Sequence, residues 1–296
     1  MNQGNVTQGF SPAVLSLRKL YRAKKKDIAA RLGEFREVWK KGSGEDVFAE
    51  LCFCLLTPQS KALNCWDAVC AARKKGLLRS GCESSIAMCL HRKVRFHNHK
   101  ASYIVAARKL FSENGRLKIK ETIQKITDYH ESTKVPRKHE KKLFSQGTYE
   151  NLKFIGLKEE NKSSFSLCSR QFPVKRTLRA SVRQSPRPGL DKQTCGGTPW
   201  LIIRGWMVEN IKGMGYKEAS HFLRNIGFGK DIAILDRHIL KNLKDLGVIS
   251  EIPDTLTEKK YFEIEGKMRD FSERAGIPLE ALDLLFWSMQ TGHIFK

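Results

Sequence analysis

The chain has 296 residues, a mass of 33.8 kDa and a formal net charge of +23, with a pI of about 9.8. This length can bury a sizeable core in one domain or two small ones, and the charge favours a polyanionic partner without identifying it. No apolar run is long enough to span a membrane, and no apolar secretory segment stands at the N-terminus. We therefore expect an intracellular protein of the cytoplasm or nucleoid.

Cysteine spacing gives no support for a metal site. No two of the eight cysteines form a Cys-x-x-Cys pair, the usual zinc or redox motif. None follows Cys195, which excludes an iron–sulfur cluster held by four C-terminal cysteines. No metal ligands are predicted.

The N-terminal part of the sequence has helical periodicity. Residues 13–40 and 45–56 place apolar side chains three and four positions apart, which predicts two helices separated by a Gly-Ser-Gly sequence. Thr57 can cap a third helix and Pro58 suits its first position. This third helix is expected to stop at Gly76.

Short helices are predicted over residues 82–90 and 101–111, and between them Phe96 stands among basic side chains. Its ring could stack on an unpaired base while the basic side chains contact phosphates. Alternatively, it could pack against the following helix as an apolar staple.

The character of the sequence changes near residue 129. Residues 130–199 are basic and rich in serine, with scattered prolines and no sustained helical or strand period. We expect this segment to be mostly disordered or loosely tethered. The predicted domains are therefore 14–129, an N-terminal helical part; 130–199, a basic insert of low order; and 200–296, a second helical part.

Helical periodicity returns in four more places besides the central stretch. These predicted helices cover 200–208, 236–246, the residues between Thr257 and Gly276, and 278–289. No segment alternates convincingly as a strand. The expected fold class is all-α, with two helical lobes.

A glycine turn lies at the centre of the second part. Gly213 and Gly215 flank Met214 in a turn that only residues without a Cβ could tighten so far, and a helix follows it. Amides exposed at such a turn and at a helix N-terminus form an anion site. In so basic a chain the expected anion is a nucleic-acid phosphate.

Lys217 follows this turn. Helical spacing places it with His221 and Arg224 on the helix face opposite the apolar side. It could be an amine nucleophile or an ordinary solvated lysine. Asp236 follows the apolar run 232–235 and is well placed to cap the next helix, which does not exclude a catalytic role. The intervening chain is long enough to bring Asp236 back to Lys217.

These residues resemble a known family. A Gly-x-Gly hairpin, a lysine at its exit and an aspartate nineteen positions later are similar to the helix-hairpin-helix DNA glycosylase superfamily. The sequences at 49–61, 94–100 and 287–296 more closely resemble its archaeal-type 8-oxoguanine DNA glycosylase/AP lyases. The resemblance covers roughly 14–125 and 200–296, and because that family has only a short connection between these parts, the intervening residues are a departure from its pattern.

The resemblance implies a bifunctional DNA repair enzyme that flips out 8-oxoguanine, excises it and cleaves the strand. Lys217 would form a Schiff base with the sugar, and Asp236 would stabilise the oxocarbenium-like state. The hairpin at Gly213, Met214 and Gly215 would grip phosphate. Arg237 and His238 would contact phosphate or support Asp236, and the sequence does not separate these two roles.

Recognition of the base is implied for Gln59, Phe96, Trp287 and Lys296. Read from the residues alone, Gln59 could be a polar residue in a capped first turn and Trp287 could be a core residue. A terminal lysine such as Lys296 is commonly solvated.

The implied partner is double-stranded DNA containing oxidised guanine. The protein is expected to bind it as a monomer, and no association with a membrane is expected. No cofactor is required, although a monovalent cation is allowed at the hairpin. Two alternatives stay open. A non-enzymatic helix-hairpin-helix DNA-binding protein would also use a glycine hairpin and basic charge, and a glycosylase could instead prefer oxidised pyrimidines, against which the missing cluster cysteines argue.

Overall fold

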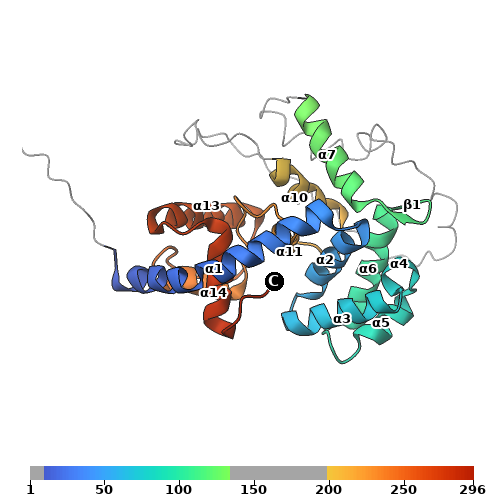
Figure 1. The fold of residues 1–296 in the computed structure, drawn as a ribbon, viewed down its shortest axis with the longest axis horizontal. Helices are drawn as coiled ribbons and strands as arrows, with labels where there is room; N and C mark the ends of the chain where they lie inside the picture. Colours follow the sequence, from blue (N-terminus) through green and yellow to red (C-terminus); the bar gives the residue numbers. More distant parts are fainter. Residues whose placement is uncertain (1–9, 134–198) are drawn as a thin grey trace, which may run out of the picture. The chain divides into compact units, whose positions relative to one another are not determined.

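The computed structural model describes residues 10–133 and 199–296, and these residues are mostly helical (Figure 1). Within them, the strands are limited to β1 (Ser112–Glu113) and β2 (Arg116–Leu117), an antiparallel pair. The predicted all-α class is confirmed. Residues 134–198, which hold most of the predicted basic insert, lie outside the described residues.

The helices keep the labels of Figure 1 and follow one another in the order α1 (Pro12–Lys41), α2 (Gly44–Leu56), α3 (Ala62–Lys74), α4 (Leu77–Ser80), α5 (Glu83–Leu90), α6 (His97–Phe111), α7 (Ile119–Thr133), α10 (Pro199–Asn210), α11 (Tyr216–Asn225), α12 (Arg237–Asp245), α13 (Glu258–Ala275) and α14 (Leu279–Thr291). Across the described ranges, no helix combines the length and the apolar character needed to cross a bilayer.

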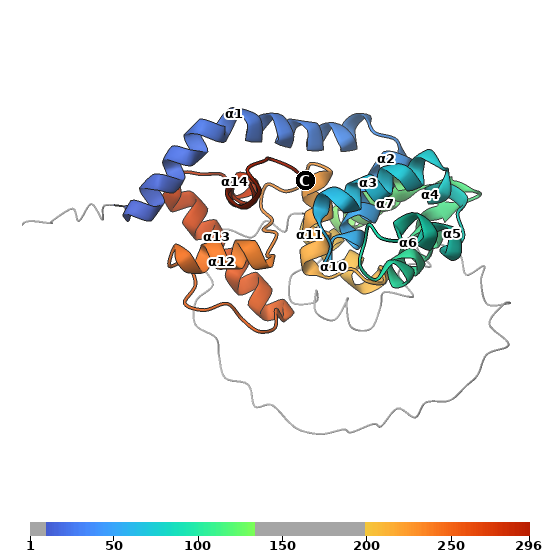
Figure 2. The same cartoon turned by 90° about the horizontal axis from the view of Figure 1, so that it is seen from below.

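Two apolar cores confirm the two predicted lobes. The first core is built from α2 to α7 with α10 and α11, and the second from α1 with α12, α13 and α14. Figure 2 shows α12 and α13 on one side and α3 to α6 on the other, with α1 running along both. Both lobes belong to one compact unit, made of residues 10–127 and 200–296 of the described chain.

Two short segments pass from one core to the other. Tyr216 packs against the second core, whereas Ala219, one turn later in α11, is buried in the first. Ile232 belongs to the first core and Leu235 to the second. The start of α11 and the segment that leads to Asp236 therefore both lie where the lobes meet.

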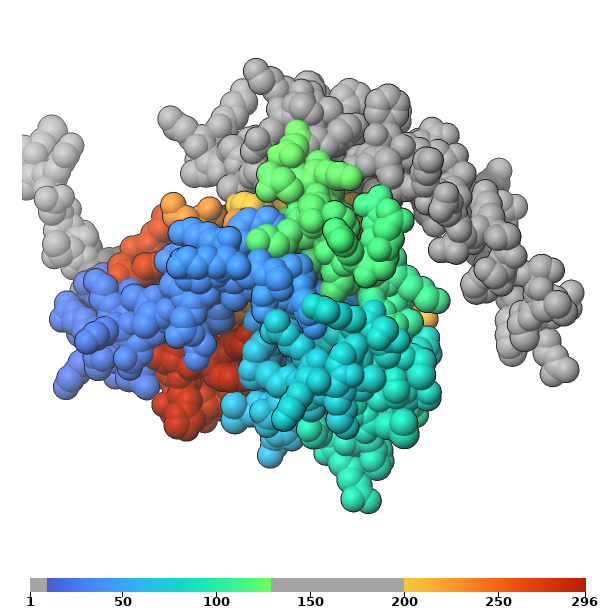
Figure 3. Space-filling model, turned by 45° about the vertical axis from the view of Figure 1, so that its right-hand side comes forward, coloured from blue at the N-terminus to red at the C-terminus, as the bar shows by residue number. Residues whose placement is uncertain are grey.

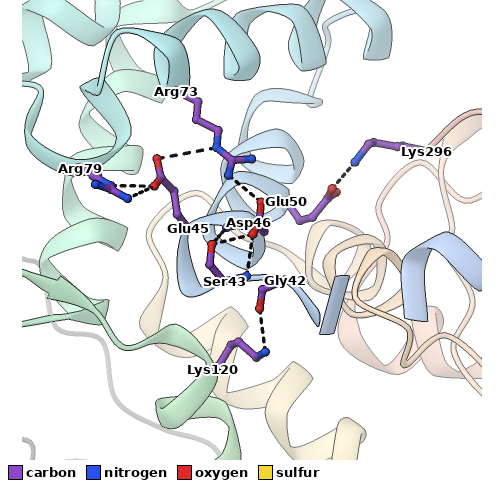
Figure 4. A network of polar contacts seen from close by, with 9 residues as sticks. All are labelled: Gly42, Ser43, Glu45, Asp46, Glu50, Arg73, Arg79, Lys120 and Lys296. Atoms are coloured by element: carbon purple, nitrogen blue, oxygen red, sulfur yellow. Dashed lines mark hydrogen bonds and ion pairs between the residues drawn. The ribbon is translucent and has the colours of Figure 1, made fainter. Parts of the chain in front are cut away.

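The start of α2 is fixed by a capping box. Ser43 Oγ accepts a hydrogen bond from the Asp46 amide at 3.2 Å, and the Asp46 carboxylate accepts one from the Ser43 amide at 2.7 Å. Arg73 of α3 donates to Asp46 at 2.7 Å, and Arg79 pairs with Glu45 (Figure 4). These bonds anchor α2 against α3 and α4, and α2 in turn carries several groups of the candidate site.

The predicted helix start at Thr57 is wrong. Thr57 is the residue that ends α2: its amide bonds the carbonyls of Phe53 and Cys54, and its hydroxyl donates to the Cys54 carbonyl at 2.9 Å. A threonine hydroxyl can bond backward to a carbonyl as readily as it caps forward. The next helix, α3, begins only at Ala62.

Candidate active site

The hairpin between α10 and α11 turns sharply at Gly213. Its φ is +82°, and a Cβ placed there would lie 2.3 Å from the ring of Tyr103 in α6. Both the left-handed backbone and the approach of this ring require glycine. Met214 is buried in the first core, so only its backbone faces the outside of the turn.

Gly215 contributes differently from the prediction. Its φ is −104°, which any residue adopts, and its amide donates to Glu218 Oε2 at 3.2 Å. The predicted need for a residue without a Cβ therefore holds at Gly213 but not at Gly215. Within the described chain, the amides of Lys212 and Gly213 have no intramolecular acceptor, and these are the hairpin groups free to bind an anion.

Lys217 lies in the first turn of α11 and reaches across to the end of α2. Its Nζ donates to Thr57 Oγ1 at 3.3 Å and lies 3.2 Å from Glu218 Oε1. The side chain is 23% exposed. This amine is thus held by two partners, yet it stays accessible to a ligand.

Asp236 begins α12 as its N-cap, as predicted, and Oδ1 accepts a hydrogen bond from the amide three residues on at 2.8 Å. The preceding residue, Leu235, donates its amide hydrogen to the Tyr261 hydroxyl at 3.3 Å, and that hydroxyl lies 3.1 Å from Ser220 Oγ. Ser220 stands one turn after Lys217 on α11. A buried hydroxyl therefore links the helix of Lys217 to the segment that ends at Asp236.

A buried ion pair braces the same junction. The Arg204 guanidinium donates to both carboxylate oxygens of Glu265, at 2.7 and 2.9 Å, and to Ser220 Oγ at 3.1 Å. Glu265 also accepts the amide of Ala233 at 2.8 Å. Because the pair is bidentate and fully desolvated, it fixes α10, α11, α13 and the 232–235 segment together.

The face of α11 that was predicted to lie opposite its apolar side is largely buried. Lys217, His221 and Arg224 do share a face, but α1, α2 and α14 cover it beyond the first turn. Arg224 pairs with Asp283 of α14 at 3.2 Å, and His221 packs edge-on against Phe53, with ring centroids 5.4 Å apart. Desolvation, aided by nearby cations, lowers the pKa of His221 well below 6.5. The imidazole therefore stays neutral.

Lys296, the last residue of the printed sequence, is held rather than solvated. Its ammonium pairs with Glu50 of α2 (Figure 4) and lies 3.4 Å from the ring centroid of Trp66 in α3. Asn225 of α11 donates to the other oxygen of Glu50 at 2.9 Å. In the space-filling view the C-terminal residues, in red, lie between α1 in blue and α3 in cyan (Figure 3). Desolvation lowers the pKa of Lys296, and Glu50 opposes this shift.

Three other predicted residues occupy α12 and α14. Trp287 is half-buried and packs against the first core, although most apolar residues of α14 belong to the second. Trp287 can therefore pack in the core and also lie at the junction of the two lobes. Arg237 and His238 are exposed in the first turn of α12, beside Asp236, where both are open to a phosphate.

Gln59 and Phe96 both have left-handed backbone. Gln59 lies in the turn between α2 and α3 with φ of +54°, and Phe96 precedes α6 with φ of +57°. Phe96 is 56% exposed, which is more than a side chain packed on α6 as an apolar staple would be. Residues other than glycine, asparagine and aspartate rarely adopt this conformation, so the surrounding structure must hold both residues in it.

Several site residues were missed by the sequence analysis. Glu50 and Trp66 hold Lys296, and Glu218 contacts Lys217 directly. Tyr261 and Arg204 lie within predicted helices, but neither was predicted to belong to the site. The one available signal was a glutamate and an arginine at otherwise apolar helical positions, because such charges are seldom buried without a partner.

Comparisons with known proteins show which family the chain is similar to. A family model described as 8-oxoguanine DNA glycosylase matches residues 28–165 and 170–277. An 8-oxoguanine DNA glycosylase/AP lyase of Fusobacterium nucleatum is 36% identical over 280 residues, which cover 95% of this chain and 96% of that protein. That relative therefore shares most of the length at residues 130–199, which the family resemblance had marked as a departure.

A protein of the same description from Methanocaldococcus jannaschii is 52% identical over 95 residues, 32% of this chain and 45% of that protein. The crystal structure of an 8-oxoguanine DNA glycosylase from that organism has a TM-score of 0.62 and 29% identity, covering 96% of this chain and 95% of that one. A second crystal structure contains the 8-oxoguanine glycosylase/lyase of the same organism in complex with a 15mer DNA containing 8-oxoguanine. It has a TM-score of 0.61 and 28% identity, and the match covers 95% of this chain and 100% of that one. The two lobes, the glycine hairpin and these likenesses together show that the chain belongs to the 8-oxoguanine DNA glycosylase family of helix-hairpin-helix proteins.

Proposed function

We propose that this chain excises 8-oxoguanine from duplex DNA and cleaves the strand at the resulting abasic site, with Lys217 as nucleophile and Asp236 as the assisting carboxylate. The observation that carries the proposal is the position of Lys217. Its amine is partly exposed at the junction of the lobes, and the Tyr261 hydroxyl links its helix to the segment that ends at Asp236.

Base excision requires the damaged nucleotide to leave the duplex stack, because the anomeric carbon is otherwise out of reach. The lone pair of the Lys217 amine attacks C1′ of the sugar, and the glycosidic bond breaks with its electron pair leaving on the base. The secondary ammonium that forms loses a proton, and the departing base takes up that proton. Positive charge develops on the sugar as this bond lengthens. The Asp236 carboxylate stabilises that charge, since opposite charges attract strongly where water is excluded.

Strand cleavage follows from the same covalent adduct. The sugar ring opens to give a protonated Schiff base with Lys217, and this iminium acidifies the hydrogen on C2′. Loss of that proton and departure of the 3′-phosphate complete a β-elimination. Hydrolysis of the Schiff base then frees the lysine. One amine therefore supports both the glycosylase and the lyase reaction.

Substrate binding in this account uses the remaining residues of the site. The hairpin amides at Lys212 and Gly213 contact phosphate, and a monovalent cation coordinated by hairpin carbonyls would strengthen that contact. Gln59 and Phe96 approach the displaced base from exposed loops, and Trp287 and Lys296 recognise it from the C-terminal side. The structure of the M. jannaschii relative with DNA containing 8-oxoguanine supports this choice of substrate.

The test compares the unchanged chain with Lys217→Gln and, as a matched control, Lys230→Gln, an exposed lysine outside the site. Lys217→Gln is expected to lose both base release and strand cleavage while still binding the damaged duplex, and Lys230→Gln is expected to keep all three. Strand cleavage retained in Lys217→Gln would contradict the assignment. Parallel assays with oxidised pyrimidine duplexes test the base, since faster release of these would contradict the proposed substrate.

A further inference from the structure

Lys100, in the first turn of α6, is a buried cation with no part in the proposed chemistry. It is 3% exposed, and its Nζ donates to the carbonyls of Leu56 and Pro58 at 2.8 and 2.6 Å and to Ser60 Oγ at 3.0 Å. An ammonium has three N–H groups, so each has an acceptor. Desolvation lowers the pKa of Lys100 to about 8. The three hydrogen bonds offset part of the cost of burying this cation.

The three acceptors of Lys100 all belong to the end of α2 and the turn that follows it. Gln59 lies between two of them, Pro58 and Ser60, with its left-handed φ of +54°. A glutamine keeps such a conformation only where its surroundings determine it. The Lys100 ammonium constrains Gln59 because it bonds the residues on either side of it, Pro58 and Ser60.

The same group of bonds fixes the second loop. Ser60 Oγ accepts not only from Lys100 but also from the Arg95 amide at 3.0 Å. Phe96 follows Arg95 directly, and its carbonyl accepts a hydrogen bond from the Lys100 amide at 3.0 Å. Ser60 and Lys100 therefore tie the loop of Gln59 to the loop of Phe96.

Lys217 contacts none of the three acceptors of Lys100. Thr57, which accepts from Lys217 Nζ, is held by the last turn of α2 through its amide and its hydroxyl, both bonded to the Cys54 carbonyl. Loosening the turn beyond Thr57 would leave this partner in place. The lysine chemistry and the loop arrangement are therefore separable.

We propose that Lys100 is a positioning residue that acts through Ser60 to hold Gln59 and Phe96 in place for excision of the base. This role rests on the proposed function and refines it. Excision needs the displaced base to be held against these loops, whereas strand cleavage at a preformed abasic site has no base to hold. Loss of the Lys100 contacts therefore slows base release selectively.

The test uses Ser60→Ala, Lys100→Met and the matched control Lys109→Met, which removes an exposed lysine from the other end of the same helix. Two single-turnover rates are measured with each full-length protein: release of 8-oxoguanine from a duplex and cleavage of a duplex with a preformed abasic site. Ser60→Ala is expected to slow base release at least about tenfold and abasic-site cleavage less than about twofold. Lys100→Met should show the same selectivity, and Lys109→Met should match the unchanged chain.

Equal loss of both rates in Ser60→Ala, or no loss of base release, would overturn the positioning role. Ser60→Ala keeps the two carbonyl bonds of Lys100, so it decides the question even if Lys100→Met does not fold. Failure of the proposed function looks different, because the unchanged chain would then perform neither reaction, and the positioning role would be overturned with it.

Discussion

The Tyr261 hydroxyl lies 3.1 Å from Ser220 Oγ, in the buried junction between the two lobes. It also donates to the Ala233 carbonyl at 2.7 Å and accepts from the Leu235 amide at 3.3 Å. Through these bonds one hydroxyl sets the position of the 233–235 segment relative to α11. The separation of the proposed nucleophile from its assisting carboxylate depends on this contact.

Tyr261→Phe is expected to lower the rate of 8-oxoguanine release by about tenfold, because the segment before Asp236 would lose its tie to α11. The unfolding free energy should fall by about 1–3 kcal/mol, since the change leaves buried polar groups without a partner. Single-turnover kinetics and urea unfolding measure the two effects. Tyr21→Phe on α1 is the control, and an unchanged rate in Tyr261→Phe would remove Tyr261 from the account.

Asp236→Asn separates the two roles of this residue. Asparagine is as good an N-cap as aspartate, so the stability of α12 should change by less than about 0.5 kcal/mol. The negative charge that stabilises the sugar cation is lost, and base release should fall by at least about a hundredfold. Thermal unfolding measures the change in stability, and single-turnover assays measure the rate of base release. Full activity in a well-folded Asp236→Asn protein would show that Asp236 serves only as the N-cap of α12.

Glu50→Gln tests how Lys296 is held. Without the carboxylate the Lys296 ammonium would remain desolvated beside Trp66 with no counter-charge, so its segment should leave the site. Release of 8-oxoguanine is expected to fall about tenfold or more, while binding of undamaged duplex stays the same. Glu45→Gln, at the opposite end of α2, is the matched control. A loss of undamaged-duplex binding equal to the loss of activity would indicate general damage to the fold.

The buried His221 predicts a pH dependence of stability. Its pKa in the folded chain is well below 6.5, so at acid pH the unfolded chain binds a proton that the folded chain does not. Stability from this group is therefore present above about pH 6.5 and lost as the pH falls below it. Urea unfolding of the unchanged chain and of His221→Leu at pH 7.5 and 5 gives the difference. An equal decline in both proteins would show that His221 does not cause it.

The sequence predicted the parts of the site that depend on local structure. Gly213 and the capping role of Asp236 follow from backbone geometry over a few residues, and both were found. Thr57 was misassigned because its hydroxyl can bond in either direction along the chain. The burial of His221 and Arg224 depends on helices distant in sequence, which periodicity within α11 does not report.

Contacts between distant residues set the rest of the site. Glu50 and Lys296 are 246 positions apart, and Lys100 reaches back 44 positions to Leu56. A single sequence carries no pattern that pairs such residues. Glu50, Lys100 and Lys296 all lie in stretches that resemble the family, but the fold was needed to show what each charge binds.

The central claim is that the Lys217 amine bonds covalently to the sugar of the damaged nucleotide. Sodium borohydride reduces a Schiff base to a stable amine, so incubation with an 8-oxoguanine duplex and borohydride should yield a crosslinked protein–DNA species. Protease digestion and mass spectrometry then locate the modified residue. The expected adduct lies on Lys217, and Lys217→Gln should lack it whereas Lys230→Gln should keep it. No adduct from the active chain, or one on another residue, would contradict it.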